Sequence, residues 1–491
     1  MKKWIEKFKN REHKMPKVWQ SLVVLLILIA SLAIGILVFG ADAHVPLLLG
    51  VAAAAIMALF IGYRWNEIER FMIQGIAKSL QSVVILVLIG VLVGIWIVAG
   101  IVPTMIYYGL AVLKPQIFFL AALIICSIAS LATGSSWGTM GTMGVALLGI
   151  AHGLGMDIGI TAGAIISGAY FGDKLSPLSD TTNLAPSMAG TDVITHIKHM
   201  LPSTLFVYII CIIFFTLMGF VKYHGGESDL GQVELYMTTL KETFYISPVL
   251  FIVPIVVIAA IALKLPAIPG IALGILMGAI FGLIFQDSCT LGAIFNCGMN
   301  GYKSATEVEA INELLTNGGI TNMTYAITLI VIAMAFGGIM EETHLLAVLV
   351  DKLKKLAKTS GGLVTITELT CIASNFVVPD QYISIIIPGR MYAEEYKNKD
   401  LSPSSLSNTL ESAGTVTSAL VPWNTCGAYI STNLGVTVLE YGPWAMFNWL
   451  MPIVTIIMAY LGFNLKDSNG KLLFKKRREE KMNNTLQENG D

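Results

Sequence analysis

Residues 172–186 read Gly-Asp-Lys-Leu-Ser-Pro-Leu-Ser-Asp-Thr-Thr-Asn-Leu-Ala-Pro and follow directly on the apolar stretch Ile158–Phe171. The run contains the charged residues Asp173, Lys174 and Asp180 and two prolines. A charged side chain at the centre of a membrane helix costs about 3 kcal/mol or more unless it is paired, solvated or bound to a ligand. Irregular backbone persists at membrane depth only where it is buried in protein or lines a water-filled cavity. A pathway for cations would explain both the charges and the break.

The rest of the chain has the composition of a membrane protein. It is 55% hydrophobic and only 13% charged, with a mean hydropathy of +0.73, whereas a soluble domain is about 25% charged. Long stretches carry no Asp, Glu, Lys or Arg: 21–41, 79–113, 115–156, 200–221, 265–286, 412–439 and 441–465. Since a helical span needs about 20 apolar residues, we expect an all-α polytopic membrane protein with about 11 to 13 membrane segments, some of them broken. Its expected surroundings are the lipid bilayer.

Basic residues at the chain ends predict the orientation. Residues 1–19 form a basic arm, and further Lys and Arg residues gather between 471 and 481. Because cytoplasmic segments are enriched in Lys and Arg, both termini are predicted to be cytoplasmic. The arm is too charged, and the following apolar stretch too long, for a cleaved signal peptide. This topological role explains the basic ends, so no nucleic acid partner is expected.

The chain is predicted to contain two transmembrane halves. Each half has an interrupted apolar segment followed by a second, polar and proline-containing one: 132–142 with 172–186, and 374–381 with 411–427. Interrupted spans in corresponding positions of two repeats are typical of secondary transporters. We therefore divide the chain into a cytoplasmic arm (1–19), a first repeat (20–222), a polar loop (223–245), a second repeat (246–465) and a cytoplasmic tail (466–491). For 132–142, two ordinary spans joined by a Gly/Ser turn remain the alternative to a hairpin or broken span.

Oxygen-bearing side chains at the breaks are candidate sodium ligands. Hard cations prefer oxygen, and Asp180, Thr181 and Asn183 offer a carboxylate, a hydroxyl and an amide in one short segment. Ser135 and Ser136 at the other break could complete the shell. A carboxylate that holds either Na⁺ or H⁺ couples the two ions by competition. The alternatives are that Asp180 is an N-cap on a surface loop and that Asp173 forms a salt bridge to Lys174 or to another helix.

Further acidic and polar residues are candidates for coupling. We assign proton or ion coupling to Asp173, Asp180, Asp380 and Glu411, and a second-repeat contribution to the site to Asn375, Asn424 and Thr425. Glu368 and Arg390 are interpreted as a structural pair within the membrane.

The histidines and cysteines suggest no catalytic or metal centre. His196 and His199 are expected in a loop beside the membrane. The six cysteines show no C-x-x-C spacing and are expected to be reduced, although Cys289 and Cys297 could bond to each other.

Two motifs carry a resemblance to a known family. Ala132-Thr-Gly-Ser-Ser-Trp-Gly-Thr139 and the longer segment Gly163–Pro186 resemble the NhaC-type sodium/proton antiporter family, whose motif maps onto Thr133–Ser136, Asp173 and Asp180–Asn183. The resemblance runs from about residue 20 to residue 465. It implies an ion-transporter fold with two inverted repeats, each with a re-entrant hairpin and a broken helix, often as a homodimer. It also implies Na⁺/H⁺ exchange at a bacterial cytoplasmic (inner) membrane.

Three functions were compared. The leading prediction is a secondary active transporter that exchanges Na⁺ for H⁺. The alternative is Na⁺-coupled transport or exchange of a small organic anion (malate/lactate-like) or an amino acid, with Lys174 or Arg390 holding its carboxylate. An enzyme is not expected, because the sequence contains neither H-E-x-x-H nor G-x-S-x-G. No cofactor is expected either, since Na⁺ and H⁺ would be transported.

Overall fold

The computed structural model describes residues 15–222, 227–263, 265–354, 357–468 and 470–474. Within these ranges the backbone is mostly helical, and the β-structure is limited to two isolated bridges, Leu401 with Asp467 and Lys466 with Leu472. The predicted all-α class is therefore confirmed.

Helices of the first half include two that are interrupted. The chain begins with α2 (Val18–Ala33), η1 (Ile34–Val38), α3 (His44–Ile61), α4 (Trp65–Lys78), α5 (Leu80–Val98) and α6 (Ile101–Val112). It continues with η2 (Pro115–Ile117), α7 (Phe118–Thr133), α8 (Ser136–Thr139), η3 (Met140–Gly144), α9 (Val145–Gly153), α10 (Ile158–Leu175), α11 (Asp180–Ala189) and α12 (Val193–Lys222). The predicted irregular run 172–186 is thus helical at both ends, and its break spans only residues 176–179.

Helices of the middle segment follow. They are α13 (Glu227–Thr243), η4 (Pro248–Phe251), α14 (Ile252–Ala262), α15 (Ala267–Phe285), α16 (Leu291–Asn300) and α17 (Glu309–Leu315). The segment predicted as a polar loop, 223–245, therefore carries α13 over most of its described residues.

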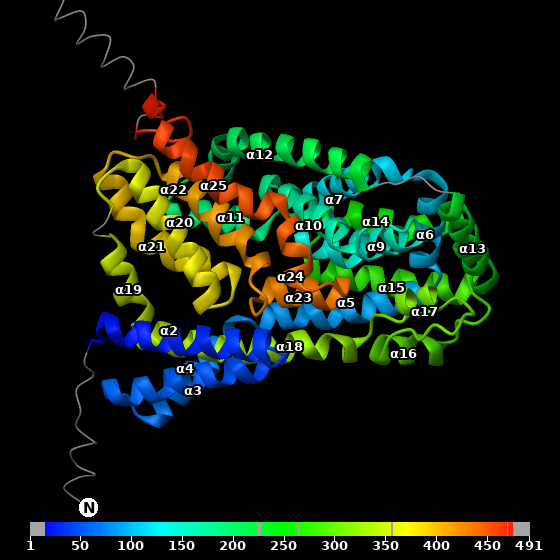
Figure 1. The fold of residues 1–491 in the computed structure, drawn as a ribbon, viewed down its shortest axis with the longest axis horizontal. Helices are drawn as coiled ribbons and strands as arrows, with labels where there is room; N and C mark the ends of the chain where they lie inside the picture. Colours follow the sequence, from blue (N-terminus) through cyan, green and yellow to red (C-terminus); the bar gives the residue numbers. More distant parts are fainter. Residues whose placement is uncertain (1–14, 223–226, 264, 355–356, 469, 475–491) are drawn as a thin grey trace, which may run out of the picture.

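Helices of the second half again include interrupted ones. They are α18 (Ile320–Glu342), α19 (Leu345–Lys354), α20 (Ser360–Val377), α21 (Gln381–Asn398), α22 (Pro403–Leu410), η5 (Glu411–Thr415), η6 (Val416–Leu420), α23 (Thr425–Leu434), α24 (Val438–Tyr441), η7 (Gly442–Trp444) and α25 (Met446–Leu461). Figure 1 shows α20, α21 and α22 gathered at one end of the molecule and α13, α16 and α17 at the other.

The chain is a multi-pass membrane protein. Six of its described helical segments are long and apolar enough to cross a bilayer in one piece, and two bent helix pairs raise this number to eight. These six are His44–Ile61, Leu80–Val98, Pro115–Thr133, Val193–Lys222, Ile268–Phe285 and Ile320–Glu342. The sequence-based number was higher because it counted long charge-free stretches such as 115–156 and 412–439, large parts of which the structure divides into shorter helical pieces.

Small residues bring α10 into close contact with α7. Gly168 and Gly172 lie one helical turn apart on α10, and a Cβ at these positions would stand 2.3 Å from Leu123 O and 2.4 Å from Ser127 O of α7. Close backbone approach at such small-xxx-small faces is the usual way in which membrane helices associate. The packing places Asp173, the next residue of α10, beside the end of α7.

The breaks of the two halves have matching dimensions. In the first half, α10 contains 18 residues, precedes the break at 176–179 and is followed by the 10-residue α11. In the second half, helical residues 403–420 precede a break at 421–424, and the 10-residue α23 follows. The likeness supports two repeats, whereas their inverted relation stays a prediction.

Candidate ion-binding site

Polar side chains cap the helices that start after the four breaks. Ser179 Oγ accepts a hydrogen bond from the backbone N–H of Thr182 at the start of α11, and Asn424 does so from Cys426 in α23. Ser135 and Asp380 begin α8 and α21 in the same way. The capping role that was considered for Asp180 therefore belongs to Ser179. Asp180 is the first residue of α11. The partial positive charge of this helix end stabilises the negative charge of Asp180.

A cavity of about 810 Å³ lies where the breaks meet. It is bordered by α5, by the α7–α8 and α10–α11 breaks, by the start of α15 and by the start of α21. Its polar lining consists of Gln81, Ser82, Thr133, Ser135, Ser136, Asp173, Ser179, Asp180, Thr181, Gln381 and Tyr382. Among the described residues that line it, two are acidic and none is a lysine or arginine. Five predicted site residues therefore share one cavity: Ser135, Ser136, Asp173, Asp180 and Thr181.

Asp173 and Asp180 face this cavity from the two sides of the α10–α11 break. Ser136 Oγ donates a hydrogen bond of 2.7 Å to Asp173 Oδ2, which joins the two breaks of the first half. The two carboxylates interact electrostatically. Asp173 is buried, whereas Asp180 is exposed and faces Tyr382. The arrangement offers two carboxylates and several hydroxyl oxygens to a cation.

Lys174 does not pair with Asp173, contrary to the alternative considered above. Its ammonium group donates a hydrogen bond of 3.2 Å to Ser412 Oγ in η5, away from the cavity. Glu411, also in η5, accepts a hydrogen bond of 3.1 Å from Thr181 Oγ1. Glu411 therefore touches the cavity wall from behind and does not line the cavity.

Asn183 lies apart from the other sodium candidates. Its side chain is exposed, and its amide donates hydrogen bonds to the backbone carbonyls of Pro177 and Ser179. The amide thereby holds the α10–α11 break in shape, and Asn183 is not part of the cavity lining.

The second-half candidates support the breaks and do not line the cavity. The Asn375 amide donates to Gly414 O and to Thr417 Oγ1, while Asn424 donates to both oxygens of Asn375. Thr425 N–H donates to Pro379 O. Asp380 Oδ1 accepts from the N–H groups of the first turn of α21, next to the lining residues Gln381 and Tyr382.

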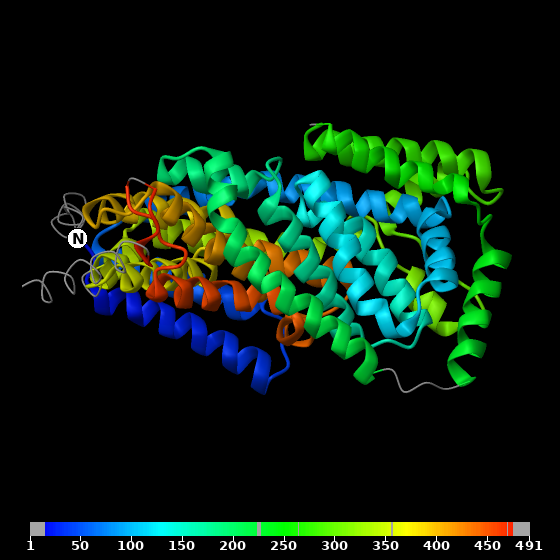
Figure 2. The ribbon, with the colours of Figure 1, turned by 90° about the horizontal axis from the view of Figure 1, so that it is seen from above.

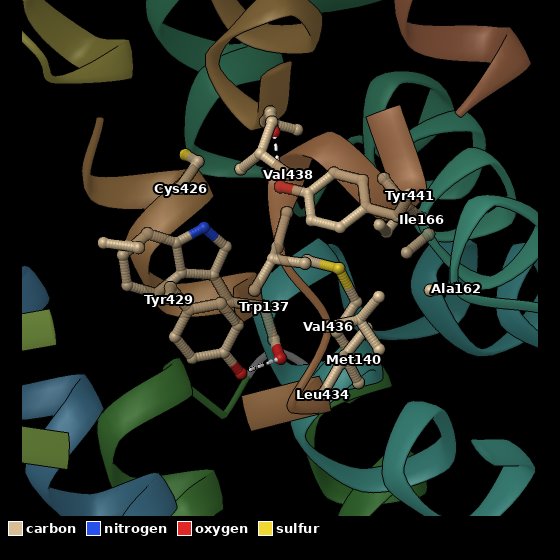
Figure 3. Packing of buried hydrophobic residues seen from close by; sticks show 14 of the residues in the cluster. Trp137, Met140, Ala162, Ile166, Cys426, Tyr429, Leu434, Val436, Val438 and Tyr441 are labelled. Atoms are coloured by element: carbon tan, nitrogen blue, oxygen red, sulfur yellow. Dashed lines mark hydrogen bonds between the residues drawn. The ribbon is translucent and has the colours of Figure 1, made fainter. Parts of the chain in front are cut away.

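An aromatic stack joins the two halves beside the cavity. Trp137, a lining residue, stacks on Tyr429 of α23 with ring centroids 4.3 Å apart, and the Tyr429 hydroxyl donates to Trp137 O. Figure 3 shows both rings with Met140 and Tyr441 in one buried cluster. The first break of one half is therefore held against α23 of the other.

Two further predictions were wrong. Arg390 is exposed, and neither carboxyl oxygen of Glu368 has a hydrogen-bond partner, so these residues form no pair. His196 and His199 do not lie in a loop but are fully buried in α12, where they contact Ser407 and Asn464. The cause is the length of α12, which extends 30 residues and carries both histidines into the protein.

The cysteines and potential metal ligands offer no second centre. All six cysteines are free and buried, so the disulfide considered for Cys289 and Cys297 is not formed. In the described part of the chain, no group of three or more His, Cys, Asp or Glu side chains could hold a metal ion.

Several residues that line the cavity were not predicted from the sequence. Gln81 and Ser82 lie in an ordinary apolar span, and only tertiary packing brings α5 to the cavity. Gln381 and Tyr382 follow a break that was recognised, but only Asn375 and Asp380 were selected from that segment. Their position directly after a proline-containing break was the signal that could have identified them.

Comparisons with known proteins identify the family. Residues 168–463 match the model of the Na⁺/H⁺ antiporter family. The chain belongs to this family. The NhaC antiporter of Alkalihalophilus pseudofirmus is 35% identical over 91% of this chain and 96% of that protein. The predicted NhaC-type resemblance is therefore confirmed.

Other relatives are named as antiporters of organic solutes. The malate-2H⁺/Na⁺-lactate antiporter of Bacillus subtilis is 38% identical over 92% of this chain and 96% of its own. The arginine/ornithine antiporter ArcD of Halobacterium salinarum is 36% identical over 92% of this chain and 93% of its own. Proteins similar to this chain are thus named for several different substrates.

Proposed function

We propose that the protein is a secondary active transporter that exchanges Na⁺ for H⁺ across a bacterial cytoplasmic membrane. The observation that carries this proposal is the cavity between the breaks, where Asp173 and Asp180 face hydroxyl groups and no described lysine or arginine. Such oxygen-rich, negatively charged surroundings suit a hard cation. NhaC relatives of the family support the choice of sodium.

Exchange follows from competition at the carboxylates. Na⁺ bound between Asp173 and Asp180 would relieve their mutual repulsion, and protons would do so equally. Since a protonated carboxyl loses its charge and most of its value as a cation ligand, a proton that enters from one side displaces Na⁺ to that side, and Na⁺ that enters from the other side displaces the proton there. Ser136 fixes the orientation of Asp173 by its hydrogen bond to Oδ2.

Transport of an organic solute is the second candidate, and the size of the cavity favours it. A volume of about 810 Å³ is far more than one sodium ion occupies and falls in the range of small-molecule sites. An organic anion such as malate or lactate would meet two carboxylates and would require Na⁺ as a bridge. A zwitterionic or cationic amino acid would fit the charge better. Neither of the proposed carboxylate holders, Lys174 and Arg390, lines the cavity.

The positions of the chain ends support the proposed orientation. In Figures 1 and 2 the first and last described helices, α2 and α25, bring both ends of the described chain to the same end of the molecule. Together with the basic end segments, this favours two cytoplasmic termini. A homodimer, expected from the resemblance, belongs to the same proposal, and a mass near twice 53.0 kDa in detergent would support it.

Flux measurements in proteoliposomes test the function. A pH gradient alone is expected to drive Na⁺ uptake, with Li⁺ and K⁺ as the selectivity panel. Malate, lactate, arginine and ornithine are then added one at a time. If Na⁺ moves only when one of these solutes is present, simple Na⁺/H⁺ exchange is wrong and the second candidate replaces it.

A further inference from the structure

A second polar centre lies behind the cavity wall. It consists of Lys174 from α10, Glu368 from α20 and Glu411 from η5, which are 1%, 0% and 0% exposed. Lys174 interacts electrostatically with both glutamates. None of the three lines the cavity. The sodium mechanism described above uses neither Lys174 nor Glu368.

Glu368 is the least supported group of this centre. Neither of its carboxyl oxygens has a hydrogen-bond partner, whereas Glu411 accepts from Thr181 and Lys174 donates to Ser412. A buried ionised carboxylate requires donors or a neighbouring cation to offset its lost hydration. Among the residues that the structure describes, Glu368 is supplied with the cation, Lys174, and with no donor. Gain or loss of one proton at Glu368 therefore changes the charge balance around Lys174 without breaking a hydrogen bond.

In the described part of the chain, few other titratable groups face Glu368. Besides Lys174, it interacts electrostatically with Cys371 of its own helix and with Tyr396 of α21. Glu411 on η5 shares Lys174 with it, and His196 of α12 faces Lys174. The centre is thus one ammonium group between two carboxyl groups, bordered by a neutral thiol, a phenol and an imidazole.

We propose that Glu368 carries a proton that is exchanged for Na⁺, with Lys174 as its charge partner, in a compartment separate from the sodium cavity. The proposal rests on the Na⁺/H⁺ exchange proposed above. In the step itself, a carboxylate and a proton combine to a carboxylic acid at Glu368, while Lys174 remains an ammonium group.

Adjacent residues of α10 couple the two compartments. Asp173 faces the cavity and Lys174 faces the glutamates, so a sodium ion at Asp173 adds positive charge next to Lys174. This added charge favours the ionised form of Glu368 and expels its proton. The hydrogen bond from Thr181, a lining residue, to Glu411 provides a second connection between the cavity and the buried centre. Sodium binding therefore favours proton release, as antiport requires.

The test compares proton release with sodium binding in the purified protein. Sodium is added to wild type and to Glu368→Gln in weakly buffered detergent solution, and bound Na⁺ and released H⁺ are counted. We expect Na⁺ affinity to stay within about threefold, whereas the number of protons released per Na⁺ falls by about one. Glu368→Asp, which keeps the carboxyl group, should restore release. Glu394→Gln, which removes an exposed carboxylate on α21, is the matched control.

The outcomes distinguish a failure of the proposed role of Glu368 from a failure of the proposed Na⁺/H⁺ exchange. If wild type exchanges Na⁺ for H⁺ and Glu368→Gln releases as many protons per Na⁺, the inference is overturned. If wild type shows no Na⁺/H⁺ exchange at all, the proposed function itself fails. Should Glu368→Gln not fold, infrared difference spectra of wild type and Glu368→Asp replace it. A protonated-carboxyl band that disappears on Na⁺ addition and shifts in Glu368→Asp supports the proposal, and its absence overturns it.

Discussion

Asp180 and Asp173 differ in their surroundings although they share one cavity. Asp180 is exposed at the first turn of α11, where the helix end stabilises its charge, and Asp173 is buried and held by Ser136. We infer that Asp180 meets the arriving ion and that Asp173 completes its dehydrated coordination. Two chemically identical side chains are thus inferred to have different tasks because their surroundings differ.

Removing the charge of Asp180 tests the first of these tasks. Asp180→Asn keeps the shape of the side chain but withdraws a ligand charge, so we expect the rate of Na⁺-dependent exchange to fall at least about tenfold, the effect of 1.4 kcal/mol. Exchange is measured in proteoliposomes, with Asp287→Asn, in an exposed loop, as the control. Full exchange with unchanged sodium affinity would remove Asp180 from the site.

Removing the hydroxyl of Ser136 tests the second task. Ser136→Ala deletes the 2.7 Å hydrogen bond to Asp173 and leaves a buried carboxylate without this donor. Hydrogen bonds to charged groups contribute about 1.5–3 kcal/mol, so the apparent KM for Na⁺ should rise roughly tenfold or more. Ser136→Thr, which keeps the hydroxyl, should retain most of the affinity. Equal KM values for Ser136→Ala and wild type would show that Asp173 needs no such orientation.

Interrupted helices are the elements that build the site. Ser179, Asp380 and Asn424 cap the helices after three breaks, and Asn375 bonds to Asn424 to hold the second-half breaks together. The α7–α10 contact through Gly168 and Gly172 then places Asp173 opposite Ser136. Residues outside the cavity therefore determine the geometry of the cavity.

A side chain at Gly172 should separate α10 from α7. A Cβ there would meet Ser127 O at 2.4 Å, so Gly172→Val forces the helices apart, which we expect to cost about 1–3 kcal/mol or more in stability. Thermal unfolding in detergent measures the loss. Gly292→Ala, whose nearest neighbour would be 3.7 Å away, is the control. A melting temperature equal to that of wild type would contradict the tight α7–α10 packing.

The whole molecule combines an acidic cavity with a buried polar centre at the junction of its two halves. Trp137 and Tyr429 stack across this junction, and α10 contributes one charged residue to each compartment. Both compartments therefore lie where the two halves meet.

Proton competition at the cavity should appear as a pH-dependent sodium affinity. Because protons compete with Na⁺ for the same carboxylates in the proposed exchange, the apparent KM for Na⁺ should rise as the pH falls, by up to about tenfold per pH unit when one proton competes. The maximal rate at saturating Na⁺ should change much less. Exchange rates measured across a pH series check this. A constant KM with a falling maximal rate would show that protons do not compete with sodium.

Cysteine labelling tests the orientation of the whole molecule. The six native cysteines are buried, so background labelling should be low. Figures 1 and 2 place α13 at the end opposite the described termini. In intact cells, a membrane-impermeant maleimide should label Glu234→Cys in α13, and Lys471→Cys only after permeabilisation. The reverse pattern would place both termini outside.

Much of the architecture was predictable from local sequence, but the location of the charges was not. The breaks near 134, 176, 378 and 421 were recognised because Gly, Ser, Asn and Pro interrupt apolar stretches. Glu368 was paired with Arg390, and Lys174 was considered as a partner of Asp173, because sequence proximity was the available guide. In the structure, Lys174 lies with Glu368 and Glu411, which are nearly 200 residues or more away in the chain.

The sequence by itself determined the membrane environment, the helical class, the broken segments and the family, because these depend on composition, periodicity and motifs that are local in the chain. The tertiary structure decided which polar side chains share the cavity and which form the centre behind it. The physical reason is that burial and pairing of charge depend on distances between helices. Residues 172–186 supply both compartments, since neighbouring side chains on one helix point in different directions.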